Sequence, residues 1–394
     1  MNEFQYCTST TIIFGKNAEN QTAQTIKSYG GRRIFLVYGG GSIVRSGLLQ
    51  RICQQLDEQG LVYETFGGAQ PNPTLGHAQA GVVAARAMQA DFILGIGGGS
   101  SLDTAKAIAH GLANPDADLW QFWSKEKTLQ ATTPMGAILT IPAAGSEMSD
   151  SAVLTNEQTG RKCGLTSQLN RPLFAILNPA LAATLPTYQI GCGVADILMH
   201  TLDRYFVPNP EDGITDALAE ALLRTVIHYG PLALKNPADY KAMSEIMWCG
   251  SLSHNGLTGL GNLTDFAPHQ LGHALSAKYG VAHGASLTAI WGSWARFVYW
   301  ENPSRFARYA KNVWNLQGGS QEELALEAIS KTEEFFRSLG LPVGLAQLGQ
   351  GKLSAQELED LAQRCSYGRT RTIGSFVKLD FADMKQIYIM ANGV

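Results

Sequence analysis

Residues 92–112 read FILGIGGGSSLDTAKAIAHGL, and this stretch decides the fold. The run Phe92–Ile96 is short and apolar, as buried strands are. The glycines at 97–99 follow directly and lead through Ser100 into a helical pattern. A glycine-rich turn between a strand and a helix lets backbone N–H groups approach a phosphate, and the helix N-terminus adds a favourable dipole. We therefore expect a phosphate-binding turn here, with Ser100 capping the helix and Asp103 on its first turn.

The same alternation of strand and helix surrounds this stretch. Further short apolar runs with the character of buried strands are Ile34–Tyr38, Ala137–Ile141 and Phe174–Leu177. Amphipathic helical patterns between the strands include Ser46–Glu58 and Leu75–Met88. Such alternation predicts a largely parallel sheet covered by helices on both faces.

The pattern changes after Pro186, where strand-like runs nearly vanish. Helical patterns take over at 190–205, 213–228, 240–255, 267–278, 286–299, 304–314, 321–339 and 354–365. A chain of 394 residues is too long for one ordinary core, so two domains are expected. We expect an α/β domain over residues 1–183 and an all-helical domain over 184–394, with the segment NPALAATLP at 178–186 crossing between them.

Composition restricts the class of protein. Hydrophobic residues make up 45% and charged residues 16%, which is typical of a well-buried globular protein. A net charge of −3 without a basic run argues against nucleic acid and membrane surfaces as partners. Six scattered cysteines without a CxxC pair fit a reducing compartment, and neither a secretory signal nor a membrane-spanning run is evident. We expect a cytoplasmic protein.

A second glycine cluster, Gly39-Gly40-Gly41-Ser42, follows the strand at 34–38. In such sheets an acidic residue at this place often holds the ribose 2′-hydroxyl of a dinucleotide. Here there is no carboxylate, and Ser42 and Arg45 come next. A hydroxyl and a cation favour a 2′-phosphate, hence NADP(H) over NAD(H). The alternative is that an acidic group comes from elsewhere in the chain.

Chemistry-bearing side chains gather in two windows of the helical half. Asp196 and His200 are four residues apart and share a helix face, as do His269 and His273. Imidazole and carboxylate together suit zinc or ferrous iron. His283 would lie about 21 Å from His269 on a continuous helix. It joins a common site only if the chain turns back, and Gly280 offers a break. For any single histidine, the alternative is a helix cap or a hydrogen bond in the core.

Several motifs, taken together in this order, resemble one known family. They are FGKN at 14–17, PNPT at 71–74, GGGSSLDTAK at 97–106, TIPAAGSE at 140–147, TGRK at 159–162, GVADILMH at 193–200, HQLGH at 269–273 and AHG at 282–284. The family is that of the iron-containing (group III) alcohol dehydrogenases. Because of YGGGS at 38–42, the chain most resembles the branch of NADPH-dependent aldehyde reductases and butanol dehydrogenases.

The resemblance implies a fold like that of dehydroquinate synthase, with an α/β dinucleotide-binding domain over residues 1–183, an all-helical metal-binding catalytic domain over 184–394 and an active site between the two. It assigns one divalent metal ion, Fe(II) or Zn(II), to Asp196, His200, His269 and His283. It makes His273 a catalytic residue near the nicotinamide, suited to proton relay. Besides the glycine clusters Gly39, Gly40, Gly41, Ser42 and Gly97, Gly98, Gly99, Ser100, the expected cofactor-binding positions are Asn72, Asp103, Thr140, Ser149, Ser151 and Lys162. A homodimer is expected as well.

The activity implied is reversible reduction of aldehydes to primary alcohols with NADPH. The alternatives are polyol oxidation like that of glycerol dehydrogenase, a metal-dependent cyclase like dehydroquinate synthase, and a non-catalytic scaffold. A cyclase acting on an anionic sugar acid needs several cations in its pocket, whereas Lys278 is the only Lys or Arg between Leu257 and Trp294. One departure from the family is Ala144, where relatives usually have threonine. The lost hydroxyl weakens one hydrogen bond by about 1 kcal/mol.

Overall fold

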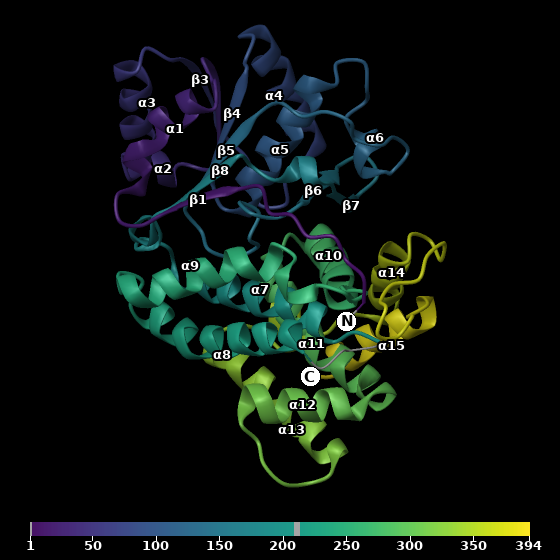
Figure 1. Ribbon diagram of the computed structural model, residues 1–394. Coiled ribbons are helices and arrows are strands. Elements are labelled where there is room, and N and C mark those ends of the chain that lie inside the picture. Colours follow the sequence, from purple (N-terminus) through teal and green to yellow (C-terminus); the bar gives the residue numbers. More distant parts are fainter. Residues whose placement is uncertain (1, 209–212) are drawn as a thin grey trace. The chain divides into compact units, whose positions relative to one another are not determined.

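The computed structural model describes residues 2–208 and 213–394 (Figure 1). The chain divides into two compact units. One, here called the α/β unit, is Cys7–Thr184. The other, the helical unit, is Leu185–Val394 together with the N-terminal residues up to Tyr6. The Asn2 side-chain amide donates to Gly261 O at 2.7 Å, which ties the N-terminal residues to the helical unit.

The α/β unit is built on a six-stranded sheet in the order β1-β8-β5-β4-β2-β3. Every neighbouring pair in it is parallel. The strands are β1 (Thr11–Phe14), β2 (Arg33–Tyr38), β3 (Val62–Phe66), β4 (Phe92–Gly97), β5 (Met135–Leu139) and β8 (Phe174–Leu177). A separate antiparallel hairpin pairs β6 (Ser151–Asn156) with β7 (Arg161–Thr166).

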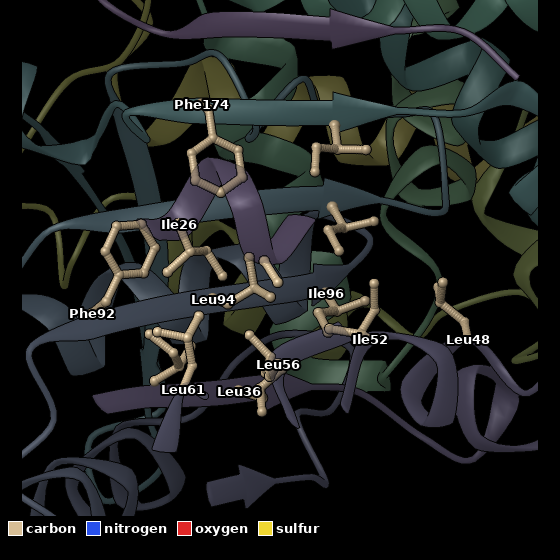
Figure 2. Close-up of a cluster of buried hydrophobic side chains, with 14 of the residues drawn as sticks. Ile26, Leu36, Leu48, Ile52, Leu56, Leu61, Phe92, Leu94, Ile96 and Phe174 are labelled. Carbon is tan, nitrogen blue, oxygen red and sulfur yellow. The ribbon is translucent and has the colours of Figure 1, made fainter. Parts of the chain in front are cut away.

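Helices cover both faces of this sheet, because its central strands are apolar on both sides. On one face, Ile34 and Leu36 of β2 pack with Ile52 of α3 (Leu48–Glu58) and with α1 (Thr22–Ser28), and Figure 2 shows part of this cluster. On the other face, Phe35 and Val37 pack with α4 (Leu75–Ala87) and α5 (Gly99–Ala113). The alternation along β2 confirms the predicted two-faced parallel sheet.

Shorter elements complete the α/β unit. They are the helices α2 (Ser42–Arg45) and α6 (Trp120–Trp123) and the 3₁₀ turns Ala18–Gln21, Gln168–Asn170 and Pro179–Ala182. Four strands were not predicted, namely β1, β3 and the hairpin strands β6 and β7. The strand expected at 137–141 lies two residues earlier, as β5.

The helical unit contains all the predicted helices of the second half. They are α7 (Thr187–Tyr205), α8 (Ile214–Lys235), α9 (Tyr240–His254), α10 (Ala267–Tyr279), α11 (His283–Val298), α12 (Pro303–Trp314), α13 (Gln321–Ser338) and α14 (Ala355–Cys365). One more, α15 (Phe381–Asn392), was not predicted, and α8 continues through Pro231 beyond its predicted end. None of the described helices has the length and apolar character needed to cross a membrane.

Candidate metal and cofactor sites

Asp196 and His200 lie on α7, a helix that is buried along most of its length. Every residue of α7 from Val194 to Tyr205 is buried. Asp196 itself is only 4% exposed, as is His200. Carboxylates and imidazoles at this depth are costly unless something compensates for the water they have lost. We therefore expect each of these two side chains to contact a group that replaces the lost water.

The turn between α10 and α11 brings His283 back toward His269. Gly280 ends α10 with φ +67°, a left-handed conformation that favours glycine, and α11 begins at His283. The predicted break at Gly280 is therefore confirmed. The next residue, Gly284, packs so tightly on α7 that a Cβ there would collide with the backbone carbonyl of Cys192. Glycine at this position lets the start of α11 approach the helix that carries Asp196.

Three imidazole nitrogens converge on one oxygen. The Nε2 atoms of His200, His269 and His283 lie 3.5, 3.7 and 3.6 Å from Asp196 Oδ1. These distances are too long for hydrogen bonds. They are close to the separation, about 3.4 Å, of neighbouring ligands bound tetrahedrally at about 2.1 Å from a zinc-sized ion.

Buried polar atoms without partners support the same interpretation. Among the described residues, Asp196 Oδ1 and His269 Nε2 are buried and have no hydrogen-bond partner. The possible ligand atoms of Asp196, His200 and His269 lie within 4.8 Å of one another, a grouping suited to a metal ion. His283 is more open, with its side chain 26% exposed. The donor set of three nitrogens and one oxygen fits Fe(II) or Zn(II).

Asp203 is a functional candidate that the sequence analysis missed. Its Oδ2 accepts a 2.5 Å hydrogen bond from His269 Nδ1, which turns His269 Nε2 toward Asp196. Burial lowers the pKa of His269, but the charges of Asp203 and Asp196 outweigh it and raise that pKa to about 9. A proton therefore competes with a metal for this ring. Asp203 could have been recognised from its spacing, because it lies seven residues after Asp196 on the same face of α7.

His254, at the end of α9, is a second residue that was missed. Its ring lies against that of His200, with centroids 3.9 Å apart and planes inclined by 30°. Burial, followed by the nearby charges of His254 and His269, holds the pKa of His200 well below its ordinary value. His200 is therefore neutral, the form that binds a metal.

His273 lies beside the ligand candidates on α10. Its ring centroid is 5.3 Å from that of His283 and 6.4 Å from that of His269. Neither His273 nor His283 is part of the grouping of Asp196, His200 and His269, but His283 Nε2 lies 3.6 Å from Asp196 Oδ1. The placement of His273 is compatible with a role other than ligation.

The β4–α5 turn has the backbone expected of an anion site. Gly97 has φ +147°, and a Cβ there would meet Ser101 Oγ at 2.6 Å. Gly98 is the N-cap of α5, so Ser100 does not cap the helix as predicted, and Asp103 lies beyond its first turn. Among the described residues, nothing accepts a hydrogen bond from the backbone N–H of Gly99 or Ser100. Free amides at a helix N-terminus attract anions.

The glycine cluster after β2 is open at one position. A Cβ on Gly39 would meet Ser101 Oγ at 3.0 Å, whereas one on Gly40 would meet no described atom within 4 Å. Arg45 folds back so that its Nη1 lies 2.7 Å from where a Cβ on Gly41 would stand. The arginine is exposed, as are Gly40 and Ser42.

The remaining predicted cofactor residues lie around these turns within the α/β unit. Lys162 Nζ donates to Asn72 Oδ1 at 2.8 Å, and Thr140 N donates to Gly97 O at 2.9 Å. Ser149 and Ser151 are joined through the hydrogen bond from Ser151 N to Ser149 Oγ, 3.2 Å long. The first contact joins the PNPT loop to β7, and the second joins the end of β5 to the β4–α5 turn.

Asp103 has an internal role. Its carboxylate accepts hydrogen bonds from Ser146 Oγ at 2.6 Å and from Val153 N at 2.9 Å. Burial raises its pKa, and the charge of Lys106, 3.8 Å away, opposes that rise. Lys106 is also fully buried, which lowers its pKa to about 8, and its Nζ donates to Ser151 O at 2.7 Å. Asp103 and Lys106 thus fasten α5 to the hairpin and the 140–147 loop.

Comparison with known proteins identifies the family. The model described as iron-containing alcohol dehydrogenase matches residues 9–179, and that of the Fe-containing alcohol dehydrogenase family, C-terminal, matches 191–391. NADH-dependent butanol dehydrogenase A of Clostridium acetobutylicum is 36% identical over 98% of this chain and 99% of its own length. NADPH-dependent aldehyde reductase YqhD of Escherichia coli is 36% identical over 89% of this chain and 90% of its own.

Solved structures agree with the sequence matches. The crystal structure of NADH-dependent butanol dehydrogenase A from Thermotoga maritima has a TM-score of 0.95 at 30% identity, covering 99% of each chain. That of Escherichia coli YqhD has a TM-score of 0.94 at 33% identity, also covering 99% of each chain. The chain belongs to the iron-containing alcohol dehydrogenase family and is an oxidoreductase.

Proposed function

We propose that this chain reversibly reduces aldehydes to primary alcohols, with NADPH as the preferred hydride donor. One divalent metal ion is held by Asp196, His200, His269 and His283. The observation that carries the proposal is the convergence of three Nε2 atoms within 3.5–3.7 Å of Asp196 Oδ1. That oxygen is buried and has no hydrogen-bond partner among the described residues. Family membership favours a dehydrogenase over the cyclase and scaffold alternatives.

The residues of the chain bind and orient, while the bound groups supply the reactive chemistry. When bound, the metal supplies Lewis acidity toward a carbonyl oxygen and the nicotinamide supplies the hydride. Asp203 holds His269 in the tautomer that presents Nε2, through its hydrogen bond to Nδ1. His273, beside His283, donates the proton that the product alcohol requires.

Two features of the α/β unit support NADPH as the preferred coenzyme. Gly40 adds no negative charge where one would repel a 2′-phosphate, and the space around it is open. The Arg45 guanidinium, near Gly41, is an exposed cation suited to a phosphate. The names of the relatives do not decide the matter, because they include both NADH-dependent and NADPH-dependent enzymes.

The metal is proposed to be Fe(II) or Zn(II), and the protein is proposed to act as a cytoplasmic homodimer. Family membership favours iron. The affinity order of divalent ions for nitrogen and oxygen ligands favours zinc. Loading the protein with each ion separately decides between them.

A spectrophotometric assay tests the proposal directly. Protein loaded with zinc, or anaerobically with ferrous iron, is supplied with straight-chain and branched aldehydes, and oxidation of NADPH and NADH is followed separately. Faster turnover with NADPH is expected. Parallel reactions with glycerol and an oxidised coenzyme examine the polyol alternative. Absence of coenzyme oxidation by protein carrying one metal ion per chain would refute the aldehyde reductase assignment.

A further inference from the structure

The candidate histidine ligands are held in different ways. A metal-binding imidazole usually donates its second ring N–H to a carboxylate, a carbonyl or water, and this bond fixes the ring orientation. His269 follows that rule through Asp203. His200 does not, because its Nδ1 is buried and has no hydrogen-bond partner among the described residues. Something else must fix the orientation of the His200 ring.

The ring of His254 lies directly against the ring of His200. The two ring centroids are 3.9 Å apart and the planes are inclined by 30°, and this is the shortest ring separation in the cluster. The ring of His269, itself held by Asp203, follows at 4.3 Å from His200. Phe266 lies farther away, 6.1 Å from His200 and 6.5 Å from His254. Rings at these separations and inclinations attract one another beyond simple burial.

The backbone holds His254 firmly at this position. His254 is the last residue of α9, and Gly256, with φ +101°, turns the chain immediately afterwards. Asn255 Oδ1 accepts a hydrogen bond from Leu257 N at 2.9 Å, which stabilises that turn. The imidazole is therefore carried by a defined helix end that packs against α7.

We propose that His254 is a positioning residue for His200: its ring, in contact with the His200 ring, keeps His200 Nε2 aimed at the metal position. The proposal rests on the proposed metal site. Contact between the two rings restricts rotation of the His200 ring. Unlike the carboxylate that holds His269, it adds no negative charge beside His200. A flat aromatic side chain at 254 is therefore sufficient, whereas an aliphatic one of similar bulk is not.

Cobalt(II)-loaded protein provides the test, because the visible absorption of cobalt reports its ligand geometry. Three variants are compared with the wild type: His254→Phe, His254→Leu and His254→Ala. We expect the leucine and alanine variants to lose cobalt to a chelator about tenfold faster, in the range found for outer-shell partners of metal ligands. Their cobalt spectra shift in band position or intensity. The phenylalanine variant keeps the wild-type spectrum and loses cobalt less than threefold faster.

The comparison of leucine with phenylalanine separates positioning from simple filling of space. If His254→Leu matches the wild type in both spectrum and cobalt release, the proposal is wrong even though the metal site stands. If the wild type itself binds no cobalt, the metal site and the positioning role both fail. His228→Leu, which changes an exposed histidine of α8, is the control and leaves both readouts unchanged. If the alanine variant does not fold, the comparison of His254→Leu with His254→Phe still tests the proposal.

Discussion

At Gly40 the chain has room for a side chain that it does not carry. No described atom lies within 4 Å of a Cβ placed there. We expect Gly40→Asp to fold normally and to lower kcat/KM for NADPH relative to NADH at least tenfold, because the carboxylate repels a 2′-phosphate and accepts a ribose hydroxyl. Steady-state assays with both coenzymes measure this ratio.

The uncharged variant Gly40→Asn separates charge from size. It has nearly the same volume as aspartate, so it shifts the coenzyme ratio much less if repulsion is the cause. An unchanged ratio in Gly40→Asp would mean that the 2′-phosphate does not lie near Gly40. An equal shift in both variants would point to steric displacement instead.

His269 and His273 share a face of α10 but have different expected roles. His269→Ala removes a proposed ligand and the partner of Asp203, so the metal content falls below one-tenth of the wild-type value. His273→Ala keeps the metal and slows turnover about 10²-fold or more, the usual contribution of a proton donor. Elemental analysis of each purified variant, alongside kcat, separates the two. If the purified His273→Ala protein contained no metal, His273 would be a ligand and its assignment as the proton donor would be wrong.

The limits of sequence reasoning differ from residue to residue at this site. The pair Asp196 and His200 could be recognised because helical spacing puts both side chains on one face. The same rule, extended one further turn, would have found Asp203. His254 could not be recognised from helical spacing, because it belongs to α9. Its place beside His200 depends on how α9 packs against α7.

At the scale of elements, an arginine clamp fixes the C-terminus of α7. Arg305 of α12 is buried and binds Asp216 of α8 through two hydrogen bonds, of 2.5 and 2.7 Å. Its Nε and Nη2 donate to Tyr205 O at 2.9 and 2.7 Å. One guanidinium therefore joins three helices, including the one that carries Asp196 and His200.

Arg305→Met should destabilise the helical unit by roughly 3–5 kcal/mol, because it leaves the buried Asp216 charge without its main partner. Urea unfolding followed by tryptophan fluorescence measures the change. The control is Arg337→Met, whose side chain is 50% exposed and lies 3.9 Å from Glu333, and it costs less than about 1 kcal/mol. If the two variants unfolded at the same urea concentration, the clamp would contribute no more than a surface ion pair.

The strands that were predicted from the sequence are those whose residues form an uninterrupted apolar run. The strands β4 and β8 are buried and apolar throughout, and β2 is buried and apolar from Ile34 to Val37. The edge strand β3 reads VYETF and is largely exposed, so its composition does not separate it from a loop. The helix α8 continues past Pro231 because its apolar face still packs on neighbouring helices, which outweighs the local preference. The strand β3 forms through its pairing with β2, and the end of α8 is set by its packing on neighbouring helices.

At the scale of the whole molecule, acid stability depends on His110, which is buried in α5. Its Nε2 bonds Asn170 Oδ1 at 2.8 Å, and Asn170 fixes that orientation by donating to Asp150 O and Leu165 O. Burial lowers the pKa of His110 from 6.5 to about 4. Between those values the unfolded chain binds the proton and the folded chain does not, so stability falls as the pH drops.

The expected loss from this group is about 3 kcal/mol between pH 6.5 and pH 4. His110→Gln keeps a donor and an acceptor but does not titrate. Urea midpoints from pH 7 to pH 4.5 should therefore fall less steeply in the variant than in the wild type. Parallel pH profiles for the two proteins would show that His110 does not control acid unfolding.

Metal and coenzyme should protect different units of the molecule from hydrogen exchange. The proposed ligands all come from α7, α10 and α11 of the helical unit, whereas the phosphate-binding turns follow β2 and β4 of the α/β unit. A ligand at a hundred times its Kd stabilises the state that binds it by about 2.7 kcal/mol. We expect zinc or ferrous iron to slow exchange in residues 187–205 and 267–298, and NADPH to slow exchange in residues 39–45 and 97–104. Mass spectrometry of peptides from protein with a chelator, with metal and with NADPH measures both effects. Metal-dependent protection confined to residues 97–104 would refute the assignment of the ion to α7, and NADPH protection that spared both glycine turns would refute the coenzyme site.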